Sequence, residues 1–220
     1  DAEEAVRAAH HLAYPVVVKP ADLDGGRGVA AGLRSDDEVR EAYLSARRLS
    51  SQILVEKHFE GKDYRVTVFN GEVIWAIERV PAGVTGDGRH TVRELVGMVN
   101  ADPRRGSGQH ALLKRLELDD EAGALLLRQG HTDASVPAAG EFVRLRRAAN
   151  VASGGTPVAV YRDIHPDNAR LAVRAAETLR LDLAGIDLLI SDIARSWQEA
   201  GAAICEVNGQ PNLGQTTAAH

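Results

Sequence analysis

Apolar residues recur along this chain with two periods, a helical period near 3.6 and a strand period of 2, and the alternation between them predicts its elements. The β-branched run Val16-Val17-Val18 ends at Lys19-Pro20, which is typical of a short buried strand. Ser35 is followed three residues later by Glu38, the spacing of a helix capping box. The first part of the chain is therefore predicted to contain helices at 2–12 and 35–49 and strands at 14–19 and 52–57.

The next part of the chain begins with a hairpin signal. Asn70-Gly71 separates two alternating segments, 63–69 and 72–79, as in a two-residue turn between antiparallel strands. From 81 to 140 glycines and charges interrupt the pattern, which predicts a less regular insertion with helices beginning at His90-Thr91 and Asp119-Asp120. The remaining predicted elements are a strand at 141–145, a turn at Gly154-Gly155, a helix starting at Pro166, and strands at 185–190 and 205–208.

Composition limits the classes of protein that this chain can belong to. With 220 residues, 44% of them apolar, it can form one large domain or two small lobes. A net charge of −5, with small and scattered basic clusters, argues against a nucleic-acid partner. No apolar run approaches the roughly 18 residues of a membrane span, and no signal peptide is visible. The single cysteine, Cys205, fits a reducing cytoplasm and is expected to be buried in its strand.

Two acidic segments near the end of the chain are the first candidate site. Glu206 and Asn208 lie two residues apart, so they share a face if 205–208 is a strand. If the strand at 185–190 pairs antiparallel with it, Asp187 joins them. Two carboxylates and an amide oxygen are hard ligands that can hold Mg²⁺ against phosphates. This short motif also occurs in many strands by chance.

A glycine-rich segment follows the first predicted strand. Lys19 would end that strand, and Gly25, Gly26 and Gly28 would expose backbone amides in the loop, as suits a polyphosphate. The spacing is neither that of a Walker loop nor that of the dinucleotide fingerprint. The alternative interpretation is a tight hairpin with an exposed lysine.

The segment from Val55 to Asp63 has the features of a nucleotide-binding edge. A chain leaving a strand can offer backbone groups to an adenine ring, while Glu56 and Asp63, seven residues apart, could reach its amine and the ribose. Taken alone, the same segment is better described as a strand followed by a solvated charged turn.

In this order, these motifs resemble the ATP-grasp superfamily. More narrowly, several segments resemble the ATP-grasp part of cyanophycin synthetases, and the similarity runs over nearly the whole chain. Bifunctional glutathione synthetases share many of these segments and are the nearest alternative, but Ser191-Asp192-Ile193 favours the cyanophycin type. The segments are Glu78-Arg79-Val80-Pro81-Ala82, Gly86-Asp87-Gly88, Asn100-Ala101-Asp102-Pro103-Arg104-Arg105-Gly106, Ala149-Asn150-Val151-Ala152-Ser153-Gly154-Gly155 and Ala184-Gly185-Ile186-Asp187.

The resemblance implies an α+β fold in which two α/β lobes with mixed and antiparallel sheets sandwich ATP. We expect a small lobe at 1–60 and a large lobe at 61–220 with an insertion at about 81–140. The implied activity is an ATP-dependent carboxylate–amine ligase that forms an amide through an acyl phosphate, with two Mg²⁺ ions. For a cyanophycin synthetase the reaction adds aspartate to a polyaspartate backbone. ATP and amino-acid or peptide substrates are thus the expected partners, and no covalent enzyme nucleophile is required.

The resemblance also assigns roles to residues. Lys19 would hold the α- and β-phosphates beneath the glycine loop. Glu56, Lys57 and Phe59 would surround the adenine, and Asp63 would accept from the ribose hydroxyls. Asp187, Glu206 and Asn208 would bind the metals, with Glu206 bridging both ions. Arg146 is the candidate to stabilise the transferred phosphoryl group. The residues expected to line the acceptor site are Asn150, Ser153, Gly154 and Gly155.

The chain departs from the family pattern in its glycine loop, which lacks a histidine, and after Asn208, where it reads Gly209-Gln210-Pro211-Asn212-Leu213-Gly214. We also expect the chain to be part of a longer multidomain protein and to be a poor catalyst by itself. The sequence leaves the oligomeric state open. A nucleotide-binding module that has lost catalysis is the alternative from a different functional class.

Overall fold

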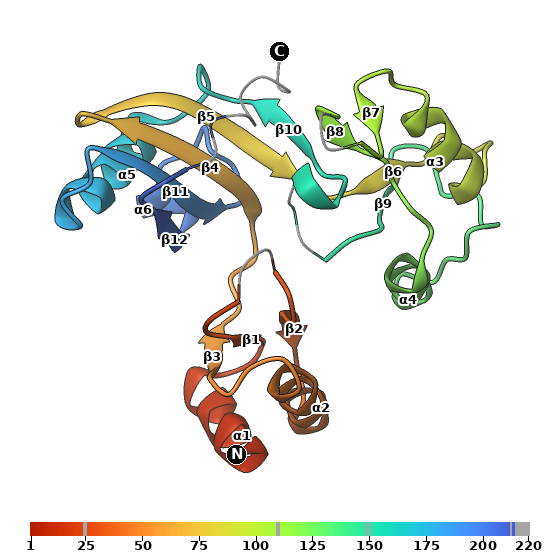
Figure 1. Ribbon diagram of the computed structural model, residues 1–220, viewed down its shortest axis with the longest axis horizontal. Coiled ribbons are helices and arrows are strands. Elements are labelled where there is room, and N and C mark those ends of the chain that lie inside the picture. The colour runs from red at the N-terminus through yellow and green to blue at the C-terminus, as the bar shows by residue number, and fades with distance from the viewer. Residues whose placement is uncertain (24–25, 109–110, 148, 150, 212, 214–220) are drawn as a thin grey trace. The chain divides into compact units, whose positions relative to one another are not determined.

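The computed structural model describes residues 1–23, 26–108, 111–147, 149, 151–211 and 213 (Figure 1). Gly25 and Asn150, both assigned a role above, lie outside the described residues. The chain divides into two compact units, Asp1–Phe59 and Glu60–His220, each of which is described by itself.

The first unit is a three-stranded antiparallel sheet with two helices, and both helices and the first and third strands lie close to their predicted positions. The strand order is β2-β1-β3. Val16 and Val18 of β1 are fully buried, together with apolar residues of both helices, whereas Lys19 belongs to the alternate, half-exposed set of β1 positions. The elements are α1 (Ala2–Leu12), β1 (Val16–Pro20), β2 (Ala30–Leu33), α2 (Asp36–Arg47) and β3 (Ile53–Lys57).

The predicted cap of α2 is formed at Ser35, whose hydroxyl accepts from the amide of Glu38 at 3.3 Å. The Glu38 carboxylate accepts from the amide of Arg34 at 2.6 Å, one residue beyond the partner that a capping box would give it. A complete capping box instead begins α1, between Asp1 and Glu4.

The second unit contains a five-stranded antiparallel sheet in the order β10-β5-β4-β11-β12. The predicted hairpin is confirmed: Asn70 and Gly71 have φ values of 48° and 78° and connect β4 to β5. The strands are β4 (Lys62–Phe69), β5 (Glu72–Val80), β10 (Thr156–Ala159), β11 (Leu183–Ile190) and β12 (Ala202–Asn208).

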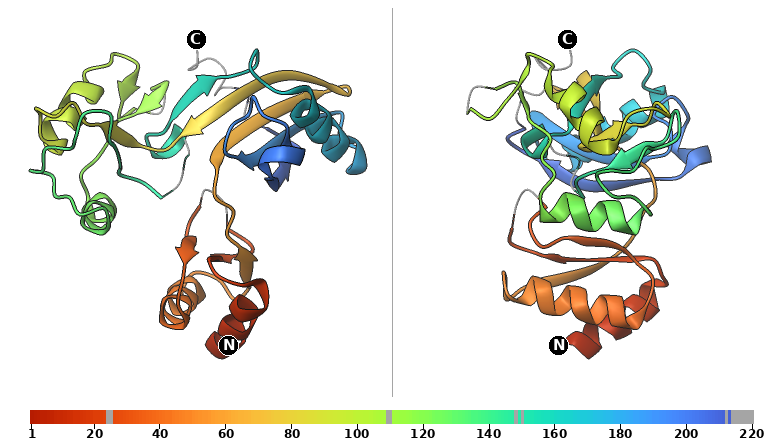
Figure 2. Two further views of the ribbon diagram at one scale, coloured as in Figure 1. Left: turned by 180° about the vertical axis from the view of Figure 1, so that it is seen from behind. Right: turned by 90° about the vertical axis from the view of Figure 1, so that its right-hand side faces the viewer.

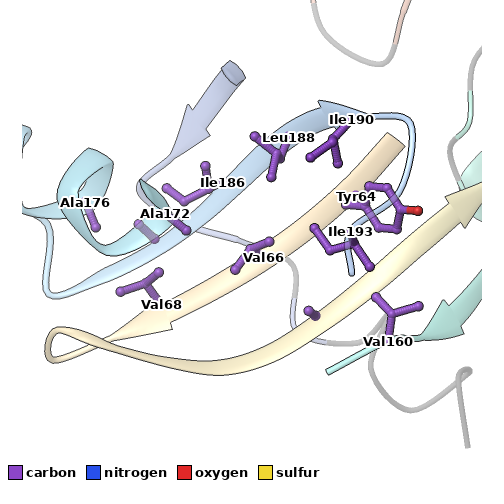
Figure 3. Packing of buried hydrophobic residues seen from close by; sticks show 12 residues of the cluster. Tyr64, Val66, Val68, Val160, Ala172, Ala176, Ile186, Leu188, Ile190 and Ile193 are labelled. Atoms are coloured by element: carbon purple, nitrogen blue, oxygen red, sulfur yellow. The ribbon is translucent and has the colours of Figure 1, made fainter. Parts of the chain in front are cut away.

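One face of this sheet is covered, and this decides where its polar residues lie. Tyr64, Val66 and Val68 of β4 and Ile186, Leu188 and Ile190 of β11 form one buried cluster with Ala172 and Ala176 of α5 (Pro166–Thr178). In Figure 3, Ala172 and Ala176 lie at the end of the cluster near Val68 and Ile186, and Tyr64 and Ile190 lie near Ile193 at the other end. The views in Figures 1 and 2 agree that α5 and the short α6 (Trp197–Ala200) lie along the sheet. Because side chains alternate along a strand, the intervening residues of β4, β5 and β11 belong to the opposite face.

The segment predicted as an insertion has a core of its own, built from Val84, Leu95, Leu126 and Val143, among others. The predicted helices begin where expected, because Thr91 and Asp119 cap α3 and α4. The short strands form two small sheets, β6 with β9 and β7 with β8. The elements are β6 (Gly83–Thr85), α3 (Val92–Asn100), β7 (Arg105–Gly106), β8 (Leu113–Lys114), α4 (Asp120–Arg128), β9 (Phe142–Arg144) and the 3₁₀ turn η1 (Val151–Ser153).

The expectation that Cys205 is buried is wrong. Cys205 is exposed because β12 is the last strand at its edge of the sheet, so that little packs over this part of the strand. None of the helices in the described part of the chain is both long and apolar enough to cross a bilayer.

Candidate active site

The two acidic strands pair as the sequence analysis anticipated. In the antiparallel register of β11 and β12, Asp187 lies opposite Glu206, and Gly185 lies opposite Asn208. Asp187 alternates with the buried Ile186 and Leu188, so it lies on the face that α5 does not cover. The Asp187 side chain is only 6% exposed, whereas Glu206 is exposed.

These three side chains suit a hard divalent cation. The Asn208 side-chain amide donates to the Gly185 carbonyl at 3.4 Å, which leaves the amide oxygen of Asn208 as an acceptor. With the carboxylates of Asp187 and Glu206 this gives an all-oxygen donor set of the kind that Mg²⁺ accepts. Across the described residues, no group of three or more His, Cys, Asp or Glu side chains could hold a metal. The candidate site contains only two side chains of these types, Asp187 and Glu206, because its third donor is the amide oxygen of Asn208.

Two arginines that the sequence analysis did not assign to the site hold Asp187 in place. Arg65 of β4 lies opposite Asp187 in the sheet register. Its Nε contacts Asp187 Oδ1, and its Nη2 donates to Oδ2 at 3.1 Å. Arg79 of β5 reaches the same carboxylate, with Nη2 2.8 Å from Asp187 Oδ2. The predicted metal ligand is therefore ion-paired from two neighbouring strands.

Arg79 also connects the metal candidate to the ribose candidate. Its Nε and Nη2 donate to Asp63 Oδ1 at 3.0 and 2.6 Å. Burial raises the pKa of the Asp63 carboxyl above its ordinary value, an effect that the pairing with Arg79 opposes without cancelling. Burial also works against the charge of Arg79, but attraction to Asp63 and Asp187 outweighs it, so the pKa of Arg79 is raised. The Arg79 guanidinium thus remains charged beside Asp187.

Gly185 makes room for this arrangement. A Cβ at this position would lie 3.0 Å from Arg65 Cδ and 2.8 Å from the Pro211 Cβ. The side chain of Arg65 and the segment that follows β12 therefore both pass over the bare backbone of β11. A larger residue would displace one of them.

In the first unit, the structure brings together two predicted nucleotide contacts. The Lys19 ammonium lies 2.6 Å from Glu56 Oε2, a diagonal pair across β1 and β3. Gly26 and Gly28, the described glycines of the loop, have φ values of 76° and 73°, which a residue with a Cβ would rarely adopt. Phe59, where this unit ends, is 37% exposed.

Lys57 has other partners. Its ammonium donates to the carbonyls of Ala13 and Tyr14, at 2.7 and 3.4 Å, where α1 ends. A cation near unsatisfied C-terminal carbonyls stabilises a helix. The contacts of Lys57 in the first unit are thus with the backbone after α1.

Arg146, the predicted phosphoryl-stabilising residue, is held by acidic side chains of the insertion. It makes a bidentate pair with Asp119, with both distances 2.9 Å, and lies 3.8 Å from carboxylate oxygens of Glu117 and Glu121. Because Asp119 also caps α4, this cluster fixes the start of that helix. Among the described residues, the hydrogen-bond and ion-pair partners of Arg146 are all in or next to the insertion, and none is on the acidic strands.

The predicted acceptor loop is attached to the insertion by a different arginine. Arg105 donates to the Gly154 carbonyl at 3.0 Å and to the Thr156 hydroxyl at 2.7 Å. The same guanidinium donates to the Lys114 carbonyl at 2.7 Å. Ser153 lies in η1 beside this attachment, and Gly154 has a φ of 95°. Arg105 therefore ties β7 and β8 to the start of β10.

Sequence reasoning missed Arg65 and Arg79, and only Arg65 had a signal in the sequence. Arg65 lies two residues after Asp63, so the two share a face of β4. A regular hairpin about Asn70-Gly71 would have aligned Asp63 with Glu78 and placed Arg79 on the other face. The register shift between Thr67 and Val68 moves β5 by one residue and brings Arg79 to the face of Asp63 and Arg65.

Comparison with known proteins identifies relatives over nearly the whole chain. Residues 1–79 match the sequence model described as the ATP-binding domain of the carbamoyl-phosphate synthase L chain. Cyanophycin synthetase of Nostoc sp. is 44% identical over 213 residues, which are 97% of this chain and 23% of the relative. The glutathione biosynthesis bifunctional protein GshAB of Clostridium perfringens is 33% identical over 200 residues, 90% of this chain and 26% of the relative. The chain thus spans about a quarter of the length of these curated relatives.

Solved structures agree on the fold. A bifunctional glutathione synthetase from Pasteurella multocida matches 97% of this chain and 30% of its own, with a TM-score of 0.64 and 31% identity. The ATP-grasp ligase PsnB, complexed with a phosphomimetic variant of a minimal precursor, Mg and ADP, matches 100% of this chain and 45% of its own, with a TM-score of 0.50 and 14% identity. The chain therefore has the α+β ATP-grasp fold and belongs to the ATP-grasp superfamily, with cyanophycin synthetases more similar to it in sequence than bifunctional glutathione synthetases.

Proposed function

We propose that the protein carrying this chain is an ATP-dependent carboxylate–amine ligase of the cyanophycin synthetase type, which adds aspartate to a polyaspartate backbone. The observation that carries the proposal is the 44% identity to a cyanophycin synthetase over 97% of the chain. The register that places Asp187 opposite Glu206, with Asn208 two residues further along β12, supports it.

In this proposal the γ-phosphoryl group of ATP passes to the acceptor carboxylate, and the ADP oxygen leaves with the electron pair of the broken bond. The amine of aspartate then attacks the acyl phosphate, phosphate leaves, and an amide forms with loss of the amine proton. The chain contributes positioning and charge neutralisation. Mg²⁺, bound as two ions by Asp187, Glu206 and Asn208, would neutralise charge on the transferred group.

Nucleotide-binding roles are proposed for side chains of each unit, taken separately. In the first unit Lys19 would leave Glu56 for phosphate oxygens, and Glu56 would then accept from the adenine amine. Their 2.6 Å ion pair supports this, because the two partners satisfy each other until a ligand with complementary groups replaces both. The Phe59 backbone would face the adenine, with Lys57 nearby, and Asp63 would accept from the ribose. The domains would be a small lobe at 1–60 and a large lobe at 61–220.

On the acceptor side, Arg146 remains the proposed phosphoryl-stabilising residue and Asn150, Ser153, Gly154 and Gly155 the proposed acceptor loop. The attachment of Gly154 and Thr156 to Arg105 supports a loop held in one place. The ion pairs of Arg146 with Asp119 mean that it would have to exchange a carboxylate for the phosphoryl group.

A glutathione synthetase type of ligase is the second candidate. The TM-score of 0.64 to a bifunctional glutathione synthetase favours it, and the residues discussed above would serve both reactions. The two candidates differ in the acceptor carboxylate and the amine, so the choice of substrates separates them.

The test is ATP-dependent phosphate release by the full-length protein. Aspartate with a primer of aspartate carrying arginine is compared with γ-glutamylcysteine and glycine. Release with the first pair alone is expected. Release with the second pair alone would establish the glutathione type, and nucleotide binding without release under either condition would indicate a module without catalysis.

The same assay tests the metal assignment through Glu206→Gln. Loss of the carboxylate should lower the rate at least about 100-fold, because a neutral amide cannot replace a charged ligand of a divalent cation. Glu199→Gln on α6, an exposed glutamate of the same unit, is the matched control and should retain the parent rate. Equal rates for the two variants would remove Glu206 from the site.

A further inference from the structure

The cluster of two arginines and two aspartates lies on the face of the sheet that α5 does not cover, and it points to a role that the proposed reaction does not itself require. We infer that Arg79 is a positioning residue that makes binding of a divalent cation at Asp187 conditional on bound nucleotide. The inference rests on the proposed function for the identity of the nucleotide and the metal, but its test needs no turnover.

The geometry places Arg79 between two carboxylates with different proposed roles. Its guanidinium makes two bonds to Asp63 Oδ1, at 3.0 and 2.6 Å, and one contact with Asp187 Oδ2, at 2.8 Å. The side chain is 10% exposed, so water screens these interactions little. Arg79 is therefore anchored at Asp63 and reaches across to the predicted metal ligand.

Arg79 and Arg65 together use most of the capacity of Asp187. A carboxylate has about four lone-pair positions. Arg65 donates to one lone-pair position on each oxygen of Asp187, and Arg79 occupies the second position on Oδ2. Among the described contacts one position on Oδ1 remains. A cation bound by Asp187 would use this position, and there it would lie beside two guanidinium groups.

The charges of the surrounding residues show what a cation would meet. Asp63, Asp187 and Glu206 face Arg65 and Arg79, so that three negative charges are almost balanced by two positive ones. A divalent cation entering alone gains little from so nearly neutral a cluster and is repelled by both arginines. A polyphosphate adds several negative charges and offers oxygens to which Arg79 can donate in place of Asp187.

Arg79 is better suited than Arg65 to give up its contact with Asp187. Arg65 holds both Asp187 oxygens and lies over Gly185, where a Cβ would be 3.0 Å from its Cδ. Arg79 loses a single contact if it moves, and its two bonds to Asp63 keep the guanidinium in the cluster. Nucleotide and metal binding would thereby be coupled through one side chain.

The experiment titrates Mn²⁺ into the nucleotide-free full-length protein and follows free Mn²⁺ by electron paramagnetic resonance. The parent protein should bind Mn²⁺ weakly, and a non-hydrolysable ATP analogue should strengthen binding. In Arg79→Gln, Mn²⁺ should bind the nucleotide-free protein about 10-fold more tightly, because a competing cation is gone. The analogue should then strengthen binding less than in the parent. Arg79→Lys, which keeps the charge, should stay close to the parent.

Lys62→Gln is the matched control. Lys62 lies on β4, pairs with Glu78 at 3.0 Å, and belongs to the set of residues on the other face of the sheet. The substitution Lys62→Gln removes one positive charge from the pair of strands β4 and β5, as Arg79→Gln does. If net charge alone controlled Mn²⁺ affinity, both Lys62→Gln and Arg79→Gln would bind Mn²⁺ more tightly than the parent. Equal tightening in Lys62→Gln and Arg79→Gln, or none in Arg79→Gln, would overturn the inference.

A second variant decides the question if Arg79→Gln does not fold. Asp63→Asn removes the carboxylate that competes with Asp187 for Arg79. Arg79 should therefore pair more strongly with Asp187, and Mn²⁺ should bind more weakly than in the parent. Tighter Mn²⁺ binding in Asp63→Asn would contradict the inference. Absence of phosphate release in the parent would reject the proposed function while leaving these titrations interpretable.

Discussion

At the scale of single residues, two lysines of the first unit have different partners although both were assigned to the nucleotide. Lys19 pairs with the Glu56 side chain, a partner that a ligand can replace. Lys57 donates to the Ala13 and Tyr14 carbonyls after α1, which have no other role in the proposed chemistry. This difference in partners suggests that the two side chains contribute to different properties of the protein.

We therefore predict that Lys19→Met lowers affinity for an ATP analogue by at least about 10-fold, since a charge-assisted phosphate contact is lost. Lys57→Met should change that affinity less than about 3-fold but lower the stability of the first unit by about 0.5–1 kcal/mol, through loss of bonds to helix-terminal carbonyls. Isothermal titration and urea unfolding measure the two effects. A large loss of affinity in Lys57→Met would show that the Lys57 side chain contributes directly to nucleotide binding.

At the scale of elements, β11 positions the candidate metal site, because this strand combines a buried face with an acidic residue and a glycine. Ile186 and Leu188 fix the strand on the core, and Asp187 between them lies on the other face. Gly185 allows Arg65 and Pro211 to approach the backbone. The same strand thus supplies the proposed metal ligand and the space for the arginine that orients it.

Gly185→Ala tests this arrangement. The added methyl would lie 2.8 Å from the Pro211 Cβ and 3.0 Å from Arg65 Cδ, so one of them must move. We expect a loss of about 1–3 kcal/mol in stability, measured by urea unfolding, together with a lower rate of phosphate release. Gly71→Ala is a useful comparison, because its Cβ would meet nothing within 4 Å and only its φ of 78° opposes the substitution. An unchanged rate in Gly185→Ala would show that Arg65 and Pro211 adapt without consequence for the site.

Local signals predicted most elements correctly because their causes lie within a few residues. Asn70-Gly71 determines a hairpin through its positive φ values, and Thr91 and Asp119 begin their helices by accepting backbone hydrogen bonds. These are the parts of the fold that periodicity and capping can predict. The antiparallel pairing of β11 with β12 was only a condition for bringing Asp187 beside Glu206 and Asn208, and the strand register meets it.

The arginine contacts at Asp187 could not be predicted in the same way, because they depend on which strands become neighbours. Arg65 is 122 residues from Asp187 in the sequence, and only the order β5-β4-β11-β12 brings them together. The insertion posed a similar problem: its glycines and charges suggested irregular structure, but long-range pairing of β6 with β9 gives it a core. Arg146 was chosen through the family resemblance, because related ligases need an arginine near the metals, and the acidic residues around α4 that hold it come from a different segment.

At the scale of the whole chain, the two units have separate cores. The core of the first unit contains only residues between Ala5 and Val55, and those of the second unit begin at Tyr64. Both tryptophans, Trp75 and Trp197, belong to the second unit. Tryptophan fluorescence therefore reports on one unit, while hydrogen exchange resolved by peptide reports on both.

From these separate cores we predict that a core substitution acts on the unit that contains it. Val18→Ala should cost the first unit about 2 kcal/mol by deleting buried methyl groups, and should raise exchange in residues 1–59 without moving the tryptophan transition in urea. Val66→Ala is the matched substitution in the second unit, since both valines are fully buried, and it should move the tryptophan transition. If Val18→Ala shifts that transition as far as Val66→Ala does, the units unfold as one cooperative structure, and Lys57→Met should then destabilise the whole chain.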